Sequence, residues 1–539
     1  MKMISKISLT IAIFFSLFLI NTSFAQEGPS SRLEIEEIIV TGTKRDIGQQ
    51  DAAIAVSAIT EQAFANQNAN DPRAIASLVP NVTLTLQPAF NAVAGGIRGT
   101  GSISILVTED PSVAFLVDDF GLNHVQSQFI EMFDIEQIEV YRGPQGTLFG
   151  KNATGGVISV TTKKPVLDEW SGEFSAMAGQ YDWNEGSINK FKLALNAPIV
   201  EGKVAMRIAA IWDKSQGFYT NSKPAGDFPG PIVLNPAAAW PDDGTSLSNV
   251  GDGGDLGGKD VLAAKVKLLF EPNANYSGHL IFEISKDDSG APPTVNETDC
   301  PGGQLFCLLG FPGIHTPSPN WGGEKWSNPY ATGESFHCNS VIAICKGHRM
   351  DSKGVYFNQT FAIGDNYTLK SITGYRNHEE RNASTYTGEA FASLYDASRN
   401  TERDQMQQEF RLTSEFDGPF NFTAGLSYAE DNLNFAAYAA VGLQWFLGVP
   451  GWIHTDYSST ATHQNRTSKA YYFDFTYEIN EAWRISAGIR ETEDEKQFVR
   501  ETGTLGNNSL GRPNNNISTG GFTRDNDVPL FNTDWLSCD

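Results

Sequence analysis

Side chains that could bind zinc and activate water stand together in this chain, but their spacing is incomplete. His378 and Glu379 begin a run in which Asn382 occupies the position of the second histidine of an H-E-x-x-H zinc motif. A G-x-S-x-G run, which would present a serine nucleophile, is absent from the sequence. These residues predict that the chain is not an enzyme.

Phosphate and cation sites are also incomplete. Gly150 and Lys151 follow a glycine-rich turn, but Gln145 and Asn152 stand where a phosphate-binding P-loop needs glycine and a hydroxyl residue. The acidic run GDGGDLGGKD, residues 251–260, lacks the spacing of a calcium-binding EF-hand and is interpreted as a solvated loop. Its carboxylates are Asp252, Asp255 and Asp260. The sequence predicts no metal and no cofactor.

Four of the five cysteines form two local pairs, each with six residues between its members: Cys300 with Cys307 and Cys338 with Cys345. In an exported chain this spacing predicts disulfides 300–307 and 338–345, with crossed pairings as an alternative. His337 and His348 beside the second pair leave a zinc site open as a further alternative. Cys538 has no obvious mate within the sequence.

Export is predicted by residues 1–25. Lys2 and Lys6 precede an apolar run from residue 7 to residue 20, and Ser23 to Ala25 form a small-x-small cleavage signal. This apolar run is too short to span a bilayer as a helix, so a cleaved signal peptide is favoured. The net charge of −24 argues against nucleic acid as a partner, because phosphate backbones select basic surfaces.

From residue 171 onward the chain repeats one unit, in which two alternating strands joined by a short turn are followed by a long polar segment. In the run 471–479, Tyr471, Phe473 and Phe475 fall on one face, while Asp474 and Thr476 fall on the other. An apolar face with aromatic edges suits lipid, and the polar face suits a wet interior, so a membrane barrel is favoured over a soluble sandwich.

Alternation predicts eleven strands, near residues 171–180, 188–197, 203–213, 261–270, 277–286, 354–362, 367–377, 406–415, 420–429, 469–479 and 483–492. Residues 46–165 do not repeat the unit. Their glycine-rich turn between two strands, near residues 143–156, indicates a compact domain with close backbone contacts.

A short β-branched run, EEIIVTG at residues 36–42, precedes this compact domain between loop-like flanks. Strands without neighbours either add to a sheet of another chain or begin a distant sheet of their own domain. Both interpretations remain open from these residues alone.

At this point a family resemblance is clear. The runs AIAVSAIT, ASLVPNVTL, GGIRGTGS, AFLVDD and IEVYRGPQGTLFGKNATGGVISVTTKKP resemble, in this order, the plug domain of TonB-dependent outer-membrane receptors, and EEIIVTGTKR resembles their TonB box. The resemblance covers essentially the whole mature chain. It implies a mixed α/β plug domain followed by an antiparallel transmembrane β-barrel of 22 strands, of which this chain carries about eleven.

The expected domains are a signal peptide at 1–25, a periplasmic segment with the TonB box at 26–45, the plug at 46–165 and the N-terminal half of the barrel at 166–539. The resemblance implies three kinds of partner. They are TonB with its inner-membrane energising complex, outer-membrane lipid and a small-molecule ligand. TonB would bind by strand addition at Glu36, Glu37, Ile38, Ile39, Val40, Thr41 and Gly42.

Two further groups of residues are expected to act in transport. Arg98 and Arg142, paired with Glu136, Glu139 or acids of the barrel wall, are expected to latch the plug, with solvated arginines as the alternative. Aromatic residues in an expected outer loop and polar residues in outer plug loops are candidates for binding the ligand. These ligand candidates are Trp445, Phe446, Trp452, Phe90, Asn91 and His124.

The predicted function is TonB-dependent uptake of a scarce ligand, of which a ferric siderophore is the family's commonest cargo. A sensing receptor is the alternative, but it would carry an extra periplasmic domain before the TonB box. Cobalamin, a glycan or a terpenoid or aromatic compound also remain possible ligands. The sequence ends on a polar run, and we expect an unclosed sheet in a chain that is a truncated fragment or the product of an interrupted gene, because open strand edges are costly in lipid. A fragment without a function of its own is the alternative to transport.

Overall fold

The structure is a computed structural model. It describes residues 39–41, 44–45, 47–50, 52–67, 70–87, 92–102, 106–128, 130–182, 186–217, 219–220, 255–256, 258–289, 348–385, 396–440, 457–480 and 483–505. The chain divides into two compact units, Met1–Ile39 and Val40–Asp539. The predicted signal peptide lies outside the described residues, and the elements below belong to the second unit except for Ile39.

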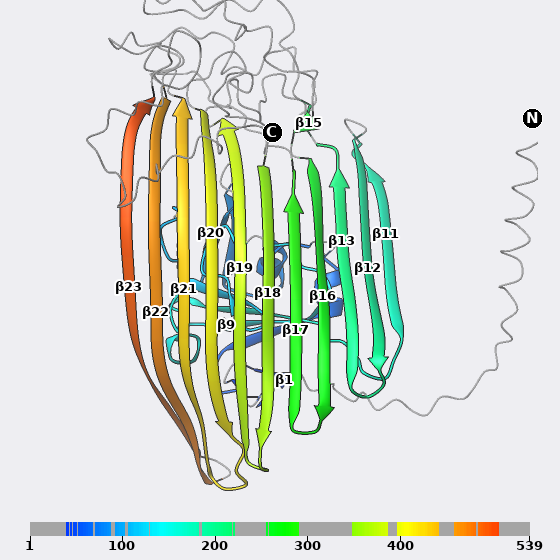
Figure 1. The fold of residues 1–539 in the computed structure, drawn as a ribbon, viewed down its shortest axis with the longest axis vertical. Helices are drawn as coiled ribbons and strands as arrows, with labels where there is room; N and C mark the ends of the chain where they lie inside the picture. The colour runs from blue at the N-terminus through cyan, green and yellow to red at the C-terminus, as the bar shows by residue number, and fades with distance from the viewer. Residues whose placement is uncertain are drawn as a thin grey trace, which may run out of the picture. The chain divides into compact units, whose positions relative to one another are not determined.

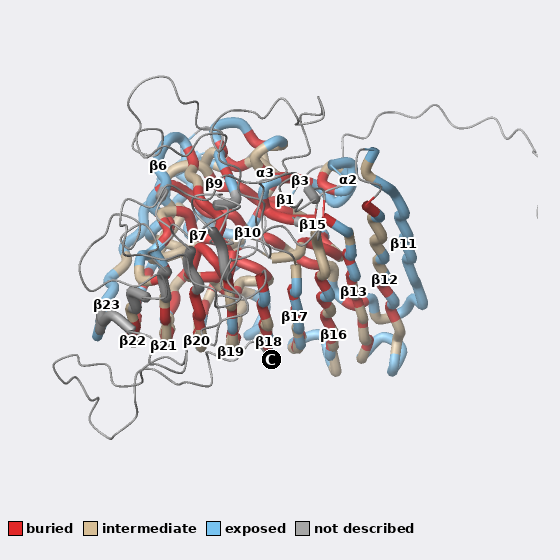
Figure 2. Tube along the Cα trace, turned by 90° about the horizontal axis from the view of Figure 1, so that it is seen from above, coloured by how far each residue is buried: buried red, intermediate tan, exposed pale blue. Residues whose placement is uncertain are grey.

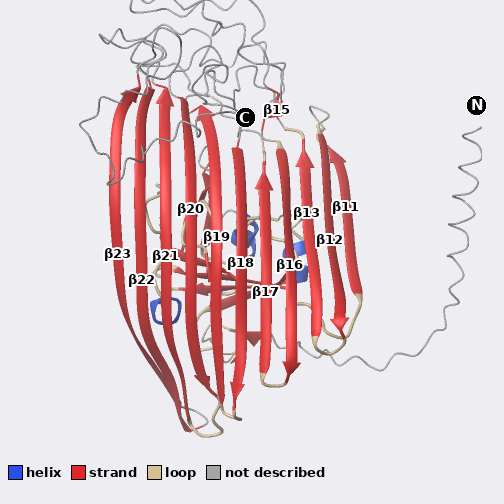
Figure 3. Ribbon diagram, viewed as in Figure 1, coloured by secondary structure: helices blue, strands red, loops and turns tan. Residues whose placement is uncertain are grey.

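Eleven antiparallel strands form one sheet, here called the wall sheet, in which each strand pairs with the next along the chain (Figure 1). Short turns join neighbouring strands at one end of the strands. Figure 3 shows the strands running side by side. The strands are β11 (Ser171–Gln180), β12 (Ser187–Val200), β13 (Val204–Ser215), β16 (Lys259–Asn273), β17 (Tyr276–Asp287), β18 (His348–Ile363), β19 (Tyr367–Thr385), β20 (Asp396–Ser414), β21 (Phe420–Ala440), β22 (Tyr457–Asn480) and β23 (Trp483–Leu505).

The two faces of the wall sheet have opposite polarity. Large apolar side chains such as Phe282, Leu426 and Ile489 are exposed on one face, whereas the other face buries charged side chains such as Lys267 and Arg403. A soluble sheet would bury its apolar face, so this inversion fits lipid outside and a polar interior. Figure 2 shows that the strands at the two ends of the sheet, β11 and β23, are exposed. Among the described residues these two strands do not pair with each other, so the barrel is not closed.

The predicted strands all occur, but several are longer than expected. β22 begins at Tyr457 rather than near residue 469, because Ser458 to Ser468 are largely polar on both faces and give no alternation signal. The ladder nevertheless continues there, with Tyr457 opposite Leu505 on β23. Hydrophobic alternation therefore marks the lipid-facing part of each strand, while backbone pairing extends beyond it.

The domain preceding the wall sheet is a mixed α/β domain, called the plug below. Its central sheet has the order β3-β9-β10-β7-β8, in which β10 runs parallel to β7 and antiparallel to β9. These strands are β3 (Val56–Thr60), β7 (Val113–Val117), β8 (Phe120–Gly121), β9 (Ile135–Arg142) and β10 (Gly156–Thr162).

Smaller elements complete the plug. A second sheet contains β4 (Val82–Gln87), β5 (Ala92–Ile97) and β6 (Thr100–Ser102), and the helices are α2 (Glu61–Ala65), α3 (Arg73–Leu78) and α4 (Gly146–Phe149). Two-stranded sheets join β1 (Ile39–Val40) with β2 (Ile47–Gly48) and β14 (Tyr219–Thr220) with β15 (Asp255–Leu256). No helix among the described residues is long and apolar enough to cross a membrane.

The plug core continues into the wall sheet. Ile138 and Ile158 of the central plug sheet are almost fully buried in a cluster that also includes Ile281 of β17 and Tyr356 of β18. Phe120 of β8 lies with its ring centroid 4.8 Å from that of Tyr356. A Cβ atom on Gly374 of β19 would lie 2.4 Å from Cδ2 of Phe120, so the ring occupies the space that the glycine leaves.

The glycines of the GGIRGTGS run allow close backbone packing. Gly95 has φ +156°, and a Cβ atom there would lie 1.8 Å from the carbonyl oxygen of Thr83 on β4. On the other side of β5, a Cβ atom on Gly96 would lie 2.5 Å from Cα of Gly101 on β6. The second plug sheet can form only with glycine at these positions.

We expect Gly95→Ala to destabilise the second plug sheet by about 1–3 kcal/mol, because the added methyl group meets backbone that cannot rotate away. Hydrogen exchange of β4 and β5 in the full chain measures the effect as faster exchange. Gly146→Ala is the control, since a Cβ atom there meets nothing within 4 Å. Equal exchange in the two variants would contradict the prediction.

Candidate functional site

The site is built around Glu139, a buried carboxylate on the central plug sheet. Alternation along β9 places Gln137, Glu139 and Tyr141 on one face, and Glu139 is 1% exposed. The Thr41 backbone N–H and hydroxyl each donate a hydrogen bond of 2.8 Å to a different oxygen of this carboxylate. The Gln137 amide donates a third bond of 2.8 Å, and the Tyr141 hydroxyl a fourth. Burial, with Glu139 beside it, raises the pKa of Tyr141, so Tyr141 remains a donor.

Two residues of the predicted TonB-binding segment thus pack against the plug. Val40 is fully buried, and Thr41 is bound to Glu139. Ile39 is 45% exposed. The other predicted residues, Glu36, Glu37, Ile38 and Gly42, lie outside the described residues.

A backbone hydrogen bond holds Lys44 close to Thr41. The Lys44 backbone N–H donates to the carbonyl oxygen of Thr41 at 2.7 Å, and Lys44 adopts φ 60°. Its side chain is 6% exposed, with Nζ 3.5 Å from Oδ1 of Asp119 and 4.1 Å from the ring centroid of Phe149. Burial and nearby Arg411 lower the pKa of Lys44, while Asp119 opposes them. A buried cation therefore lies three residues after Thr41 and is hydrogen-bonded to it through the backbone.

Asp119 links this lysine to the wall sheet. It lies in the turn between β7 and β8 with φ 69°, and its Oδ1 is 3.6 Å from the Arg411 guanidinium on β20. Arg411 also pairs with Glu409 at 2.8 Å, and the Tyr472 hydroxyl donates to Glu409 at 2.7 Å. Burial raises the pKa of Asp119, but Arg411 and Lys44 outweigh burial and hold it well below its ordinary value. The carboxylate is therefore charged.

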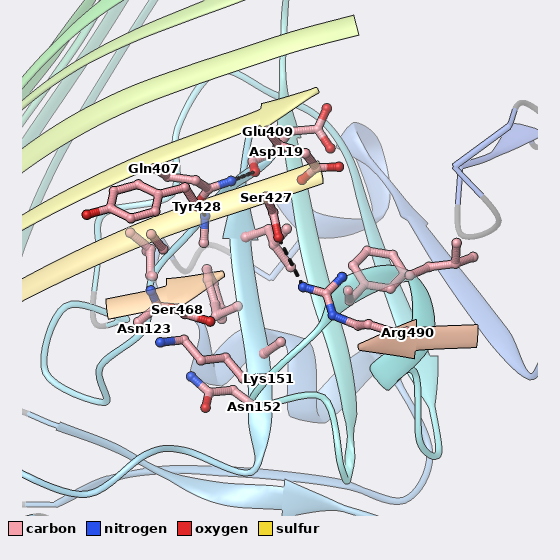
Figure 4. Close-up of a pocket in the computed structure, with 18 of the residues that line it drawn as sticks. Asp119, Asn123, Lys151, Asn152, Gln407, Glu409, Ser427, Tyr428, Ser468 and Arg490 are labelled. Atoms are coloured by element: carbon pink, nitrogen blue, oxygen red, sulfur yellow. Dashed lines mark hydrogen bonds between the residues drawn. The ribbon is translucent and has the colours of Figure 1, made fainter. Parts of the chain in front are cut away.

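A cavity of about 80 Å³ lies between this cluster and the wall sheet. Figure 4 shows Asn123, Lys151 and Asn152 of the plug lining it, together with residues of the wall sheet. The wall residues labelled there are Gln407, Glu409, Ser427, Tyr428, Ser468 and Arg490. Arg490 donates to the Ser427 hydroxyl at 3.1 Å, and burial lowers the pKa of Lys151. This cavity is called the middle cavity below.

A second cavity, of about 270 Å³, lies between the plug and strands β16 to β20 of the wall sheet. It is called the lower cavity below, and its lining is mostly polar. Plug residues Thr41, Ser159 and Lys164 line it, as do wall residues that include His279 and Lys370. The space is large enough for several waters or a polar group of a ligand.

The most buried charge pairs between plug and wall involve Asp134, at the start of β9. The Arg207 guanidinium on β13 contacts both of its oxygens, with Nε–O distances of 3.1 and 3.0 Å. Lys267 of β16 is 0% exposed and places Nζ 3.2 Å from Asp134. Farther along the wall, Arg466 pairs with Asp110 of the plug, and Arg403 donates to the Val107 carbonyl oxygen at 2.9 Å.

The residues predicted as a latch are placed differently. Arg98 is exposed with φ 54°, Glu136 is exposed, and Glu139 is bound to Thr41 instead of to an arginine. Arg142 is partly buried, and its Nε atom lacks a hydrogen-bond acceptor within the described part of the chain. No ion pair of Arg98 or Arg142 is seen there either, so the pairs that cross the interface use other residues.

His124, a predicted ligand-binding residue, is buried in the plug. Its Nε2 lies 2.5 Å from the carbonyl oxygen of Val107, and its Nδ1 accepts a hydrogen bond from the Gln126 backbone at 3.3 Å. Burial, aided by Arg403, holds the pKa of His124 well below its ordinary value. The other predicted ligand residues and the cysteines lie outside the described residues: Phe90, Asn91, Trp445, Phe446, Trp452, Cys300, Cys307, Cys338, Cys345 and Cys538.

Sequence reasoning missed Lys44, Asp119, Asp134 and Arg411. The aspartates stand in turns at positive φ, and the sequence signals only that such residues favour turns. Their partners are far away in the chain, since Asp134 and Lys267 are 133 residues apart. Within the described ranges, no group of three or more His, Cys, Asp or Glu side chains is arranged to hold a metal ion.

Comparison with known proteins gives a family match over the plug. Residues 48–157 match the family model described as the TonB-dependent receptor plug domain. The chain is 27% identical to the probable TonB-dependent siderophore receptor PirA of Acinetobacter baumannii over 203 residues, which are 35% of this chain and 26% of that receptor. It is 30% identical to the iron-regulated outer membrane virulence protein of Vibrio cholerae over 171 residues, which are 31% of this chain and 25% of that protein.

A solved structure extends the likeness to the wall sheet. The ferric yersiniabactin uptake receptor FyuA from Yersinia pestis is similar with a TM-score of 0.61 and 16% identity, covering 85% of this chain and 59% of that one. At this identity the likeness shows a shared fold. The matched regions span about a quarter of the two curated relatives and somewhat over half of the solved receptor.

Proposed function

The chain belongs to the TonB-dependent receptors of the outer membrane, and from this membership we propose that it takes up a scarce ligand with energy delivered by TonB. One relative is named as a probable siderophore receptor and the other as an iron-regulated outer membrane virulence protein. The observation that carries the proposal is the docking of Thr41 on Glu139 beside two cavities between plug and wall.

TonB is the proposed partner of residues 36–42. A β-branched segment can add as a strand to a partner sheet through main-chain hydrogen bonds, which depend little on side-chain identity. Ile39 is partly exposed, whereas Thr41 is held by the plug. A partner that captures the exposed part and pulls would act directly on the bonds between Thr41 and Glu139. Segment 26–45, plug 46–165 and wall 166–539 are the proposed working parts.

A ferric siderophore is the proposed ligand. The support is that relatives are named for siderophores and iron regulation, and that the lower cavity between plug and wall is lined mostly by polar and charged groups. Such a lining suits a hydrophilic chelate better than an apolar compound. For latching the plug, Arg98 and Arg142 stay proposals. For binding the ligand, the proposed residues are Phe90, Asn91 and the loop residues Trp445, Phe446 and Trp452.

We expect Ile39→Pro to abolish energised uptake while leaving ligand binding at the cell surface intact. Proline removes an amide donor and fixes φ, so strand addition to TonB fails. The chain is expressed in cells that lack their own siderophore receptors, and iron uptake is measured with ferric catecholates, hydroxamates and citrate, with and without a protonophore.

The matched control is Ile39→Val, which keeps the amide and the β-branched side chain. Normal energised uptake by Ile39→Pro would exclude TonB-driven transport through this segment. Failure of the unsubstituted chain to take up any of the three iron chelates, while it still binds cobalamin or a glycan, would reject the siderophore assignment.

A further inference from the structure

Two neighbouring polar side chains of the wall sheet line the lower cavity with an atom that has no hydrogen-bond partner among the described residues. They are His279 on β17, through Nε2, and Asn358 on β18, through Oδ1. The register of the sheet places the two residues directly opposite each other, and His279 is only 7% exposed. Because buried polar atoms are normally hydrogen-bonded, two such atoms in one patch need a physical explanation.

The plug fixes which atom of the Asn358 amide is left open. Nδ2 donates a hydrogen bond of 2.9 Å to the carbonyl oxygen of Asp118, so the amide cannot be flipped and Oδ1 remains the open atom. An amide oxygen can only accept a hydrogen bond, whereas the Nε2 atom of a histidine can donate one when it carries the ring proton. A group that satisfies both residues therefore carries an acceptor and a donor close together.

The same patch carries positive charge that is not paired. Lys370 on β19 lies directly opposite Arg411 on β20, and both line the cavity. Like charges at opposite positions of a sheet repel each other. Arg411 pairs with Glu409 at 2.8 Å, but in the described part of the chain no salt bridge or hydrogen bond of the Lys370 ammonium group is seen. The same holds there for Lys164, an exposed plug lysine that also lines the cavity.

Three acids line the cavity as well, but each is engaged by another group. Asp119 pairs with Lys44 at 3.5 Å. Asp118 accepts hydrogen bonds of 2.8 and 2.6 Å from the backbone N–H and the hydroxyl of Thr162. Glu271 accepts a hydrogen bond of 2.8 Å from a serine hydroxyl. Among the described residues, the two lysines therefore have no acid in salt-bridge contact.

A small oxyanion matches these features better than water does. The cavity of about 270 Å³ has room for such an ion together with water. Water can satisfy the open atoms of His279 and Asn358, but it brings no negative charge to the lysines. An oxyanion brings that charge, and hydrogen bonds to an ionised group are about twice as strong as neutral ones. Hydrogen phosphate also has a hydroxyl that can donate to the Asn358 oxygen, whereas fully ionised sulfate has none.

We propose that the lower cavity binds a small oxyanion that also carries a hydroxyl group, with hydrogen phosphate as the simplest example. Lys370 supplies positive charge from the wall sheet, and Lys164 supplies it from the plug. Nε2 of His279 donates to an oxygen of the ion, and Oδ1 of Asn358 accepts from its hydroxyl. The bound ion joins plug and wall, and the proposal goes beyond the proposed function because no step of uptake is part of it.

The experiment measures binding of radiolabelled inorganic phosphate to the full chain in detergent micelles by equilibrium dialysis. Sodium chloride keeps the ionic strength constant, so that general charge screening is the same in every sample. Lys370→Gln should weaken phosphate binding by about tenfold or more, because a charge-assisted hydrogen bond is lost. Lys370→Arg keeps the charge and should retain binding. His279→Leu is a second, independent variant and should also weaken binding.

The matched control is Lys151→Gln, which loses the same charge from a plug lysine that lines only the middle cavity. It should bind phosphate as the unsubstituted chain does. Hydrogen exchange of β17 and β18 without phosphate shows that each variant keeps the fold, and added phosphate should slow this exchange in the unsubstituted chain and in Lys151→Gln alone.

Competition identifies the chemistry of the ion. Unlabelled sulfate should compete about tenfold less well than unlabelled phosphate, because it leaves the Asn358 oxygen without a donor. Malate, a hydroxycarboxylate, tests the second source of the same chemistry. Stronger competition by malate than by phosphate would assign the site to hydroxycarboxylates, and the reverse order would assign it to free phosphate.

Three results would overturn the proposal: no phosphate binding by the unsubstituted chain, equal loss of binding in Lys151→Gln and Lys370→Gln, or sulfate competing as well as phosphate. TonB, iron and siderophores take no part in these measurements. A chain that fails the iron-uptake assay but binds phosphate in this way would therefore reject the proposed function and leave the oxyanion site in place.

Discussion

Replacing Asp134 with alanine is expected to loosen the plug from the wall sheet by about 3–5 kcal/mol. Asp134 is 3% exposed at its side chain and is shared by Arg207 and Lys267. Lys267 is 0% exposed. Removing the carboxylate leaves two cations in a site closed to water, and a buried unpaired charge costs far more than the pair contributes.

Urea titration of the full chain in detergent micelles, followed by hydrogen exchange of β9 and β10, measures this loss. Glu136→Ala is the matched control, because Glu136 lies two residues away, is exposed, and is expected to change stability by less than about 0.5 kcal/mol. A larger effect at Glu136 than at Asp134 would favour the latch predicted from the sequence over the ion pairs of the structure.

Replacing Glu139 with leucine is expected to release the Thr41 segment from the plug. Thr41 loses two hydrogen bonds to a charged acceptor, each worth about 1.5–3 kcal/mol, so the released fraction should rise by about a hundredfold or more. Trypsin cleavage after Lys44 reports this fraction, because Lys44 is 6% exposed while the segment is docked. Cleavage rates are compared in the full chain.

Thr41→Val should give a smaller increase in cleavage, since it removes the hydroxyl bond and keeps the backbone bond. Gln137→Leu is the control, because Gln137 also donates to Glu139 but does not belong to the segment. The prediction fails if Glu139→Leu leaves the cleavage rate at the value of the unsubstituted chain, or if Gln137→Leu raises it as much.

The sequence predicts the architecture well because both parts of it depend on local patterns. Alternation identifies every wall strand, since a strand between lipid and a polar interior must change polarity at each residue. Glycine-rich runs identify the plug, because close approaches such as that of Gly95 to Thr83 exclude any other residue. These requirements are met within a few residues and can be read without knowing the fold.

The site is less predictable because its contacts join distant segments. The pattern of β9 shows that Glu139 faces inward, but it cannot show that Thr41, 98 residues earlier, supplies its partners. The sequence predicts a latch at arginines next to glycines, whereas the structure places the paired cations on the wall strands and the anions in plug turns. Which of the acids meets a cation depends on the register of the wall sheet against the plug, and no local signal carries that information.

The contact between Phe120 and Gly374 has a consequence for how the chain avoids misassembly. Shifting β19 by one residue against the plug would turn its apolar face inward, and shifting it by two would place Ile372 or Arg376 against the Phe120 ring. A Cβ atom at this place already falls 2.4 Å from the ring, so either larger side chain is rejected. Phe120 therefore excludes these shifted registers of β19 by steric clash. If the plug folds before the later strands, β19 would pack against it in one register only, before the next strand is added.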